Sequence, residues 1–466
     1  MLSFKEVKVD ELANIRPFLL QSGNRLCDFT AGDIFMWRND LWTGYAIING
    51  TLIIEKKYSE GKFAFMPPLG KDPEGAMAEL DQYCLAKKLT PAFYGLDAPK
   101  LLWLRQRYPH AHFYSDRGWA DYLYRLSDLR DLPGKKYDSK RHNAHAFLKN
   151  NPEVVYRSGS QETTEAFLDF FDRYLLENQG RDISLQELNL SKEMVENYLR
   201  LSFQIGCFEK DGKIIGFSLG EIKGDTLYLH VEKALHAYPG IFQALESALL
   251  ATIPPEVVYV NREDDVNIAG LRRAKLQLHP LTILEKSFLE VTNAIDLISA
   301  IPVLTSPRLL LKGLAPEEKE DYARLSLDEI NNCYWGYDYR YDLPENTAPD
   351  ADYFAADLAA DFAERTNVSF FIHDQEGHLV GEIALYGFSA GQKCSIGIRL
   401  FPEYQGKGYA KEAAERVLRY LKEDLFYHEI AYEAYIENTP SIRLATKLGF
   451  TFVAQDRLRD YFRLTF

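Results

Sequence analysis

The sequence is poor in the residues that build disulfide frameworks and metal sites. Its 466 residues include only five cysteines, which are odd in number and scattered: Cys27, Cys84, Cys207, Cys333 and Cys394. None of them shows the close pairing of a zinc ribbon, and this usage is typical of reduced thiols rather than disulfides. We therefore expect a protein of the cytoplasm that needs no metal.

Long apolar runs are also missing. No stretch approaches the length that a membrane-spanning helix needs, and the first residues, MLSFKE, lack the pattern of a signal peptide. The remaining composition, 46% hydrophobic and 26% charged, is that of an ordinary globular protein. A chain of 466 residues is long enough for two to four domains.

Positive charge is in deficit. The chain carries 54 Lys and Arg against 68 Asp and Glu, a formal net charge of −14. An acidic surface argues against broad nucleic-acid binding and favours cationic acceptors.

Two common phosphate-binding patterns are absent, the Gly-x-x-x-x-Gly-Lys-Ser/Thr loop and the Gly-x-Gly-x-x-Gly fingerprint. A different glycine loop stands between a strand-like run over 395–401 and an amphipathic helix over 410–421. It consists of Gln405, Gly406, Lys407, Gly408, Tyr409 and Ala410. Glycines let the backbone approach an anion closely, and the helix that follows offers unpaired N–H groups and a positive dipole end. The loop therefore predicts a pyrophosphate site, with Lys407 as a mobile cation.

A second motif follows a strand-like run over 430–436. It spans residues 437–450 and includes Asn438, Ser441 and a Lys-Leu-Gly-Phe ending. Asn438 or Thr439 can cap a helix, Pro440 suits its first turn and Gly449 ends it.

Together the two motifs resemble the RimJ/RimL-like branch of the GNAT N-acyltransferases, over residues 302–466. The resemblance implies acetyl-CoA as the acyl donor and no metal. It also implies that the backbone of Ile398 and Leu400 binds the pantetheine arm and that residues 405–410 hold the pyrophosphate. Asn438 would face the pantetheine or the acceptor, and Ser441 would protonate the leaving thiolate.

The general base is open at this stage. Many such relatives carry a Glu two residues before the glycine of the strand that precedes the loop, where this chain has Ser395. We expect Glu382, on the strand-like run over 379–388, to take that role. The alternative is an ordinary exposed strand carboxylate.

The acceptor site is expected at the start of this domain, in the aromatic segment 333–341 that follows a helix-like run over 317–330. Tyr334, Trp335 and Tyr337 could line a pocket for an amine, either a protein N-terminus or a small molecule. The alternative is that these rings only pack a loop against the sheet.

The part before residue 294 repeats this order of elements. We predict a strand pair over 207–221, a strand over 226–231, a helix over 239–251, a strand over 257–260 and a helix over 268–276. The copy lacks the glycine cradle, because the stiff ring of Pro239 and a single glycine, Gly240, replace it. Residues 40–130, with an Asn49-Gly50 hairpin, suggest a third copy.

The expected fold class is therefore mixed α/β, with three GNAT-like folds in tandem. The expected domains are 1–133, 134–295 and 302–466, with a linker over 294–307 where prolines interrupt the pattern.

Two segments, 134–147 and 261–275, resemble a bacterial family related to the cytosolic C-terminal domain of phosphatidylglycerol lysyltransferase. That resemblance implies aminoacyl transfer from tRNA, but Asn267 stands where it leads us to expect a glycine. A second site is expected to include Lys135, Lys136, Lys140, Arg141, Asp264 and Asp265. The basic residues could grip phosphates and the acidic pair could position an amine. The alternatives are a solvated basic turn and a helix cap.

The sequence thus predicts an acyltransferase that moves an acetyl group from acetyl-CoA to a primary amine. Aminoacyl transfer centred on the N-terminal part, with tRNA as a partner, is the competing enzymatic hypothesis. A binding module that responds to CoA is the non-enzymatic one.

Overall fold

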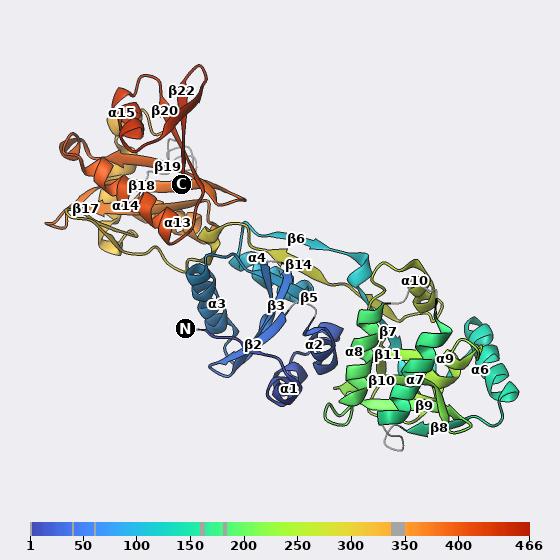
Figure 1. Cartoon of the computed structure of the whole chain (residues 1–466). Coiled ribbons are helices and arrows are strands. Elements are labelled where there is room, and N and C mark those ends of the chain that lie inside the picture. Colours follow the sequence, from blue (N-terminus) through green and yellow to red (C-terminus); the bar gives the residue numbers. More distant parts are fainter. Residues whose placement is uncertain (1, 40–41, 60–61, 159–163, 180–183, 337–349) are drawn as a thin grey trace. The chain divides into compact units, whose positions relative to one another are not determined.

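The computed structural model describes residues 2–39, 42–59, 62–158, 164–179, 184–336 and 350–466. These residues form two compact units (Figure 1). The N-terminal unit comprises residues 1–77, 92–101 and 113–289, and the C-terminal unit comprises 78–91, 102–112 and 290–466. No helix in the described ranges combines the length and the apolar composition needed to cross a membrane.

The first sheet of the N-terminal unit has seven strands in the order β1-β2-β3-β4-β5-β14-β6. Their bounds are β1 Lys5–Glu6, β2 Trp42–Ile48, β3 Thr51–Ser59, β4 Lys62–Gly70, β5 Ala92–Leu96, β14 Ser287–Glu290 and β6 His112–Ser115. The helices that accompany these strands along the chain are α1 Leu12–Leu20, α2 Ala31–Trp37, α3 Pro73–Lys87 and α4 Ala98–Arg107. The predicted Asn49-Gly50 turn joins β2 to β3, which pair in antiparallel register.

The second sheet of this unit has the order β13-β7-β12-β11-β10-β9-β8. The strands are β7 Asp121–Arg125, β8 Val155–Ser158, β9 Gln204–Lys210, β10 Lys213–Lys223, β11 Thr226–Ala234, β12 Tyr259–Asn261 and β13 Thr282–Leu284. The helices are α5 Leu126–Asp131, α6 Asp138–Asn150, α7 Thr164–Glu177, α8 Leu185–Glu196, α9 Ile241–Ala251 and α10 Ala269–Leu276. The predicted order of elements after residue 201 is therefore present.

The two N-terminal sheets exchange strands across the predicted boundary at residue 133. Strand β7 precedes that boundary but pairs with β12 and β13 of the second sheet. Strand β14 comes near the end of the unit but lies between β5 and β6 of the first sheet. A division of the chain at residue 133 consequently does not coincide with a division between sheets.

The C-terminal unit contains an eight-stranded sheet in the order β15-β16-β17-β18-β19-β20-β22-β21. The strands are β15 Leu304–Thr305, β16 Leu310–Lys312, β17 Asn367–His373, β18 Leu379–Ser389, β19 Lys393–Leu400, β20 Glu429–Tyr435, β21 Thr451–Gln455 and β22 Arg459–Thr465. The helices are α11 Lys319–Leu327, α12 Glu329–Asn332, α13 Ala351–Glu364, α14 Tyr409–Glu423 and α15 Thr439–Lys447.

Successive side chains of β17 belong alternately to two hydrophobic cores, one on each face of the sheet. Phe370 and Ile372 of β17 belong to the same core as Val417 and Leu421 of α14. Phe371, between them, belongs to the other core, with the buried residues of α11 and α13. Because successive side chains of a strand point to opposite faces, α14 covers one face and the α11–α13 pair covers the other.

The predicted linker over 294–307 is wrong at its start. Residues Ala294–Leu297 form a short 3₁₀ helix whose side chains are buried. The side chain of Asn293 donates a hydrogen bond to the carbonyl of Ser389 at 2.9 Å, and the N–H of Ala294 donates to Oε1 of Gln392 at 2.9 Å. The later prolines suggested an unpacked segment, but the chain is already packed into the C-terminal unit from Glu290 onward.

Candidate active site

The candidate active site lies where two neighbouring parallel strands separate. Strands β19 and β20 pair only over residues 393–395 and 429–431. Strand β18 pairs with β19 over nearly its whole length, with Ile398 opposite Ile383. Beyond Ser395, the sheet ladder therefore uses only one edge of β19, and the backbone groups of the other edge face the opening between the strands.

The glycine loop follows β19 and leads into α14 as predicted. Gly406 and Gly408 have φ values of 72° and 84°, in the left-handed region that favours glycine. No side chain caps α14, and a Cβ at Gly406 would meet no protein atom within 4 Å. The first N–H groups of the helix thus face open space, which suits an anion.

A groove of about 630 Å³ connects this loop to the separated edge of β19. It is lined by the predicted residues Ile398, Leu400, Gln405, Gly406, Gly408, Tyr409 and Ala410. Lys407 is not among its lining residues, and its ammonium lies 5.3 Å from the ring centre of Tyr404. The side chain of Gln405 donates to the carbonyl of Leu400 at 3.1 Å, which ties the loop to the end of the strand.

Arg308, which is distant in sequence, holds the glycine loop in place through hydrogen bonds. Its Nη1 donates to the carbonyl of Lys407 at 3.1 Å, and its Nε donates to Oε2 of Glu412 at 2.7 Å. The guanidinium also lies 4.8 Å from the ring centre of Tyr409. No sequence motif marks Arg308, because its partners lie about a hundred residues further along the chain.

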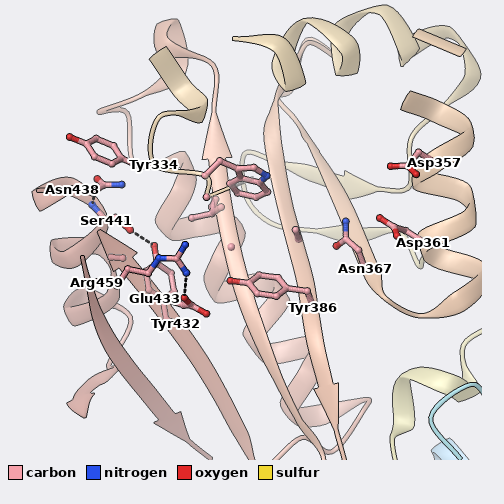
Figure 2. Close-up of a pocket in the computed structure, with 16 residues that line it drawn as sticks. Tyr334, Asp357, Asp361, Asn367, Tyr386, Tyr432, Glu433, Asn438, Ser441 and Arg459 are labelled. Atoms are coloured by element: carbon pink, nitrogen blue, oxygen red, sulfur yellow. Dashed lines mark hydrogen bonds and ion pairs between the residues drawn. The ribbon is translucent and has the colours of Figure 1, made fainter. Parts of the chain in front are cut away.

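A second cavity of about 600 Å³ opens on the face of the sheet that α13 covers (Figure 2). The two cavities share six lining residues: Tyr334, Trp335, Ile398, Tyr432, Asn438 and Ser441. The groove and this cavity therefore meet at these residues, Ser441 among them.

The side chains at this meeting point are held in place. Asn438 caps α15, its Oδ1 accepting a hydrogen bond from the N–H of Ser441 at 3.2 Å. The hydroxyls of Ser441 and Tyr432 lie 2.8 Å apart and share a hydrogen bond. Burial raises the pKa of Tyr432 above its ordinary value, so the phenol stays protonated at neutral pH. The sequence motif identified Ser441, but nothing in it pointed to Tyr432.

The aromatic residues expected at the acceptor site are partly in place. Tyr334 and Trp335 line both cavities, and the Arg399 guanidinium lies 4.4 Å from the Trp335 ring centre. The ring of Tyr334 lies 5.9 Å from that of Tyr435. Tyr337 lies outside the described residues.

Glu382 was expected to be either a base in the active site or an exposed strand carboxylate, and its surroundings fit neither. It is fully buried and lines neither cavity. Its Oε2 accepts two hydrogen bonds from Arg399, at 2.8 and 2.6 Å, and its Oε1 accepts one from Ser369 at 2.5 Å. Arg399 in turn donates to Asn332 at 2.8 Å. The carboxylate therefore anchors the segment after α11 to the sheet, and this position argues against the predicted role as base.

Replacement of Glu382 by Gln tests this structural role. The change leaves the buried guanidinium of Arg399 without its counter-charge, so we expect the free energy of unfolding to fall by about 3 kcal/mol in urea titrations. Glu415→Gln, which removes an exposed partner of Lys411 on α14, should change it by less than about 0.5 kcal/mol. Unchanged stability with loss of acetyl transfer would instead restore Glu382 as the base.

The N-terminal unit presents no equivalent cradle at α9, a helix that the structure describes in full. Gly240 precedes this helix with a φ of 86°, but a Cβ there would lie 2.2 Å from the carbonyl oxygen of Asn143. The backbone of α6 thus covers the start of α9. At the corresponding residue before α14, Gly408, a Cβ would meet only the guanidinium of Arg308, at 3.4 Å. That this copy binds no CoA stays a prediction.

Three of the four basic residues of the predicted second site each contact a different residue of the protein. Lys140 donates to Oε1 of Gln277 at 2.9 Å, and the ammonium of Lys136 lies 3.8 Å from the carboxylate of Asp128. Arg141 pairs with Asp138. Lys135, the fourth basic residue, lies in the exposed turn before α6. Helix α6 begins at Asp138 without a side-chain cap.

The two acidic residues of the same predicted site, Asp264 and Asp265, have different surroundings. Asp265 is buried and accepts hydrogen bonds from Arg272 at 2.8 and 2.7 Å and from Tyr122 at 2.6 Å, and these bonds lower its pKa to about 2. Burial instead raises the pKa of Asp264 to about 7. Asp265 is consequently engaged in holding α10.

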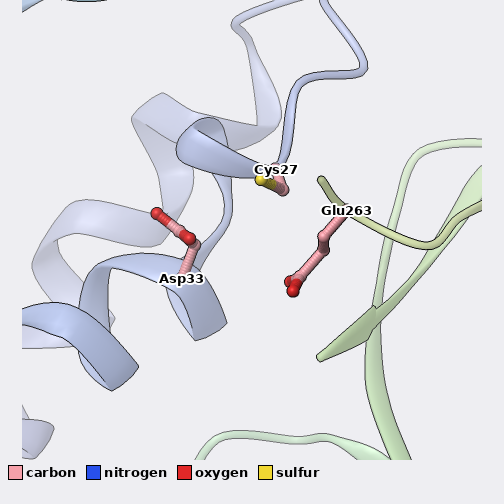
Figure 3. Close-up of side chains that lie close together, drawn as sticks. All are labelled: Cys27, Asp33 and Glu263. Carbon is pink, nitrogen blue, oxygen red and sulfur yellow. The ribbon is translucent and has the colours of Figure 1, made fainter. Parts of the chain in front are cut away.

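A network of charged side chains lies beside the start of α2, and Figure 3 draws three of its members, Cys27, Asp33 and Glu263. Potential ligand atoms of Cys27, Asp33 and Glu263 lie within 4.8 Å of one another, so they could hold a metal ion. The ammonium of Lys286, however, lies 3.1 Å from Sγ of Cys27 and 2.7 Å from a carboxylate oxygen of Asp28. A cation of the chain itself therefore already offsets much of the negative charge.

His230 provides a second cation in this network. Its Nδ1 lies 2.6 Å from Glu263 and its Nε2 lies 3.2 Å from Glu221. Burial alone would lower the pKa of His230, but the two carboxylates outweigh it and raise the pKa from 6.5 to about 10.

The pH dependence of stability tests the charge on His230. Since the folded pKa exceeds the unfolded one, the imidazolium stabilises the fold fully below about pH 6.5, and this contribution is lost as the pH rises towards 10. We expect His230→Gln to lower the thermal midpoint strongly at pH 6 and progressively less towards pH 10. His145→Gln, an exposed control, should have little effect at any pH. A constant difference between His230→Gln and the unaltered chain across this range would contradict a protonated His230.

Comparison with known proteins agrees with the two resemblances seen in the sequence. Residues 21–289 match the family model described as phosphatidylglycerol lysyltransferase, C-terminal. Residues 308–451 match the model of the acetyltransferase (GNAT) domain. The three mixed sheets with their flanking helices are thus GNAT-like folds, as the sequence predicted.

Three individual proteins illustrate these similarities. The uncharacterized N-acetyltransferase YnaD of Bacillus subtilis (strain 168) is 35% identical over 136 residues, covering 27% of this chain and 78% of the relative. The SPbeta prophage-derived uncharacterized N-acetyltransferase YokL of the same organism is 34% identical over 89 residues, 19% of this chain and 50% of the relative. A solved structure, a conserved protein of unknown function from Bacteroides thetaiotaomicron VPI-5482, is 28% identical with a TM-score of 0.58 and covers 62% of this chain and 100% of its own.

Proposed function

The chain belongs to the family of the phosphatidylglycerol lysyltransferase C-terminal domain, and because its last third matches an acetyltransferase (GNAT) domain, we propose that this last third transfers an acetyl group from acetyl-CoA to a primary amine. That the chain is an acyltransferase follows from these matches and from its N-acetyltransferase relatives. The donor, the acceptor and the residue roles are the proposal.

One observation carries it: the groove below the glycine loop and the cavity on the α13 side meet at Ser441 and Tyr432. A direct transfer needs both substrates at one point, with the nucleophile in line with the thioester. The groove offers the length and the anion cradle that suit CoA, and the cavity offers a separate entry for an amine.

The donor is assigned to the groove as follows. Its pyrophosphate accepts hydrogen bonds from the N–H groups at the start of α14, opposite Gly406 and Gly408. Its pantetheine arm lies along the separated edge of β19, at Ile398 and Leu400. The thioester then reaches the meeting point near Asn438 and Ser441.

The chemistry consists of one addition and one elimination. The acceptor amine attacks the thioester carbonyl carbon, and backbone N–H groups of β19 stabilise the oxyanion that forms. Collapse of this intermediate breaks the carbon–sulfur bond and expels the CoA thiolate. Ser441 donates its proton to that thiolate and takes one from Tyr432, to which it is hydrogen-bonded. The second proton that the attacking nitrogen loses as the amide forms then returns to Tyr432, so the relay ends as it began.

A base must also remove a proton from the attacking ammonium. With Glu382 buried away from both cavities, we assign this role to Glu433, which lines the acceptor cavity and follows Tyr432 on β20. Its ion pair with Arg459, at 2.6 Å, fixes the carboxylate in the cavity wall.

The cradle is tested by Gly406→Val. The added side chain meets no protein atom but fills the space assigned to the pyrophosphate, so we expect at least about a hundredfold loss of acetyl-CoA affinity by calorimetry. Gly377→Val is the matched control, because it has the same left-handed backbone (φ 86°) and open surroundings but lies in a turn outside the groove. Retained affinity in Gly406→Val would place the donor elsewhere. Binding without turnover over a broad amine panel would favour a CoA-responsive binding module.

A second candidate function is aminoacyl transfer from charged tRNA by the N-terminal unit. The observation in its favour is the family match over residues 21–289. Its phosphate contacts would come from Lys135, Lys136, Lys140 and Arg141, and Asp264, whose pKa is raised to about 7, would position the amine.

A filter-binding assay tests this second candidate. Lys140→Ala with Arg141→Ala should weaken tRNA binding at least about tenfold and reduce its dependence on salt, because two phosphate contacts are removed. Absence of tRNA binding by the unaltered chain would eliminate the candidate. Such a result would leave acetyl transfer by the C-terminal unit untouched.

A further inference from the structure

The acceptor cavity extends across several strands of the sheet. Its lining includes Asn367 on β17, Tyr386 on β18, Ile398 on β19 and Tyr432 on β20, which are neighbours in that order. The four strands are still paired along the row Asn367, Tyr386, Ser395 and Ala431. Neighbouring paired strands lie about 4.8 Å apart, so β17 is roughly 14 Å from β20 along this row, next to Tyr432. Figure 2 shows the carboxylates of α13 at one side of this span and Ser441 at the other. The cavity is therefore longer than an isolated amine needs.

The far wall carries two carboxylates. Asp357 and Asp361, one helical turn apart on α13, both line the cavity. Asp361 accepts a hydrogen bond from Thr366 at 2.6 Å, but it has no basic partner among the residues that the structure describes. The nearest candidate along the chain, Arg365, directs its guanidinium to the carbonyls of Phe362 and Ile298.

A second observation at the same wall points to a ligand. The Oδ1 atom of Asn367 is buried and has no hydrogen-bond partner in the described part of the chain, although Nδ2 of the same side chain donates to Ser369 at 3.2 Å. A buried carbonyl oxygen without a donor is costly, and it is satisfied when a ligand brings an N–H group. Glu433 at the opposite wall differs from Asp361, because Arg459 already neutralises it.

We propose that the acceptor is a small diamine whose second ammonium binds at Asp361, Asp357 and Asn367 while the first is acetylated at Ser441. The inference rests on the acetyl-transfer function proposed above. Allowing about 3 Å for a hydrogen bond at each end of the span, the two nitrogen atoms are roughly 8 Å apart. A volume of about 600 Å³ suits a molecule of this size. The distal ammonium is held by charge, so it sets which amine is acetylated and does not take part in the reaction.

Steady-state kinetics with three probe amines test the proposal on the full chain. Hexanediamine, with an amine at each end, should have a kcat/KM at least about tenfold above that of hexylamine, because only the diamine reaches the far carboxylates. Propanediamine, which is too short to span the cavity, should lose most of this advantage. The ratio for hexanediamine over hexylamine should fall in Asp361→Asn and approach one in Asp357→Asn with Asp361→Asn. Glu364→Gln, an exposed carboxylate on the same helix, should keep the original ratio.

Each outcome separates this inference from the proposed function. Acetylation of hexylamine and hexanediamine with equal kcat/KM would overturn the diamine and leave acetyl transfer standing. A peptide acetylated at its N-terminus in preference to all three amines would do the same. Failure to acetylate any of these amines would also overturn the diamine. Calorimetry with acetyl-CoA on the same preparations then shows whether the donor site stands and whether each variant is folded.

Discussion

The incomplete pairing of β19 with β20 is the constraint on which the C-terminal unit depends. Three residue pairs hold the two parallel strands together, and after Ser395 they separate. The backbone N–H and C=O groups of a sheet must form hydrogen bonds, either with protein or with water. The edge of β19 that faces the opening therefore needs another hydrogen-bonding partner. Strand β18 keeps β19 straight from the other side. The opening is thereby maintained by the rest of the sheet, and the groove and the acceptor cavity both reach it.

Different contacts stabilise the two sides of that opening. On the donor side, Arg308 joins the glycine loop to Glu412 of α14. On the acceptor side, the buried pair of Glu382 and Arg399 holds Asn332 against the sheet. An ion pair of this kind is expensive to break, because one partner alone is a buried unpaired charge. Ser441 and Tyr432, which line both cavities, are not engaged in these contacts and carry the proton relay that we propose.

The two parts of the chain use related folds in different ways. The start of α14 is open, whereas the carbonyl of Asn143 covers the start of α9 at Gly240. The N-terminal unit instead buries a charge network around His230 and Lys286. A helix start that is covered by backbone cannot receive a pyrophosphate, so we assign CoA to the C-terminal unit alone.

The sequence allowed prediction of features that depend on neighbouring residues. Hairpin turns, helix limits, the glycine loop and the cap at Asn438 follow from residues within a few positions of one another. The exchange of β7 and β14 between sheets could not be foreseen, because it depends on pairing between strands more than a hundred residues apart. The same holds for Glu382, whose burial comes from Arg399 and Ser369 on neighbouring strands.

Contacts across the chain also explain the residues that the motifs missed. Tyr432 is unremarkable in sequence, and only the fold brings its hydroxyl to Ser441. Asp361 reads as one of several exposed helix acids, and its importance comes from the cavity that it lines. The motifs therefore predicted residues that line the groove, whereas the residues of the second cavity depended on tertiary structure.

Hydrogen–deuterium exchange of the full chain with and without acetyl-CoA tests the central claim most directly. If the donor binds in the groove between β19 and β20, protection should appear in peptides covering 396–412 and 436–444. Peptides covering 230–245, at the start of α9, should exchange as before. Protection at 230–245 with none at 396–412 would contradict the account and place the donor in the N-terminal unit.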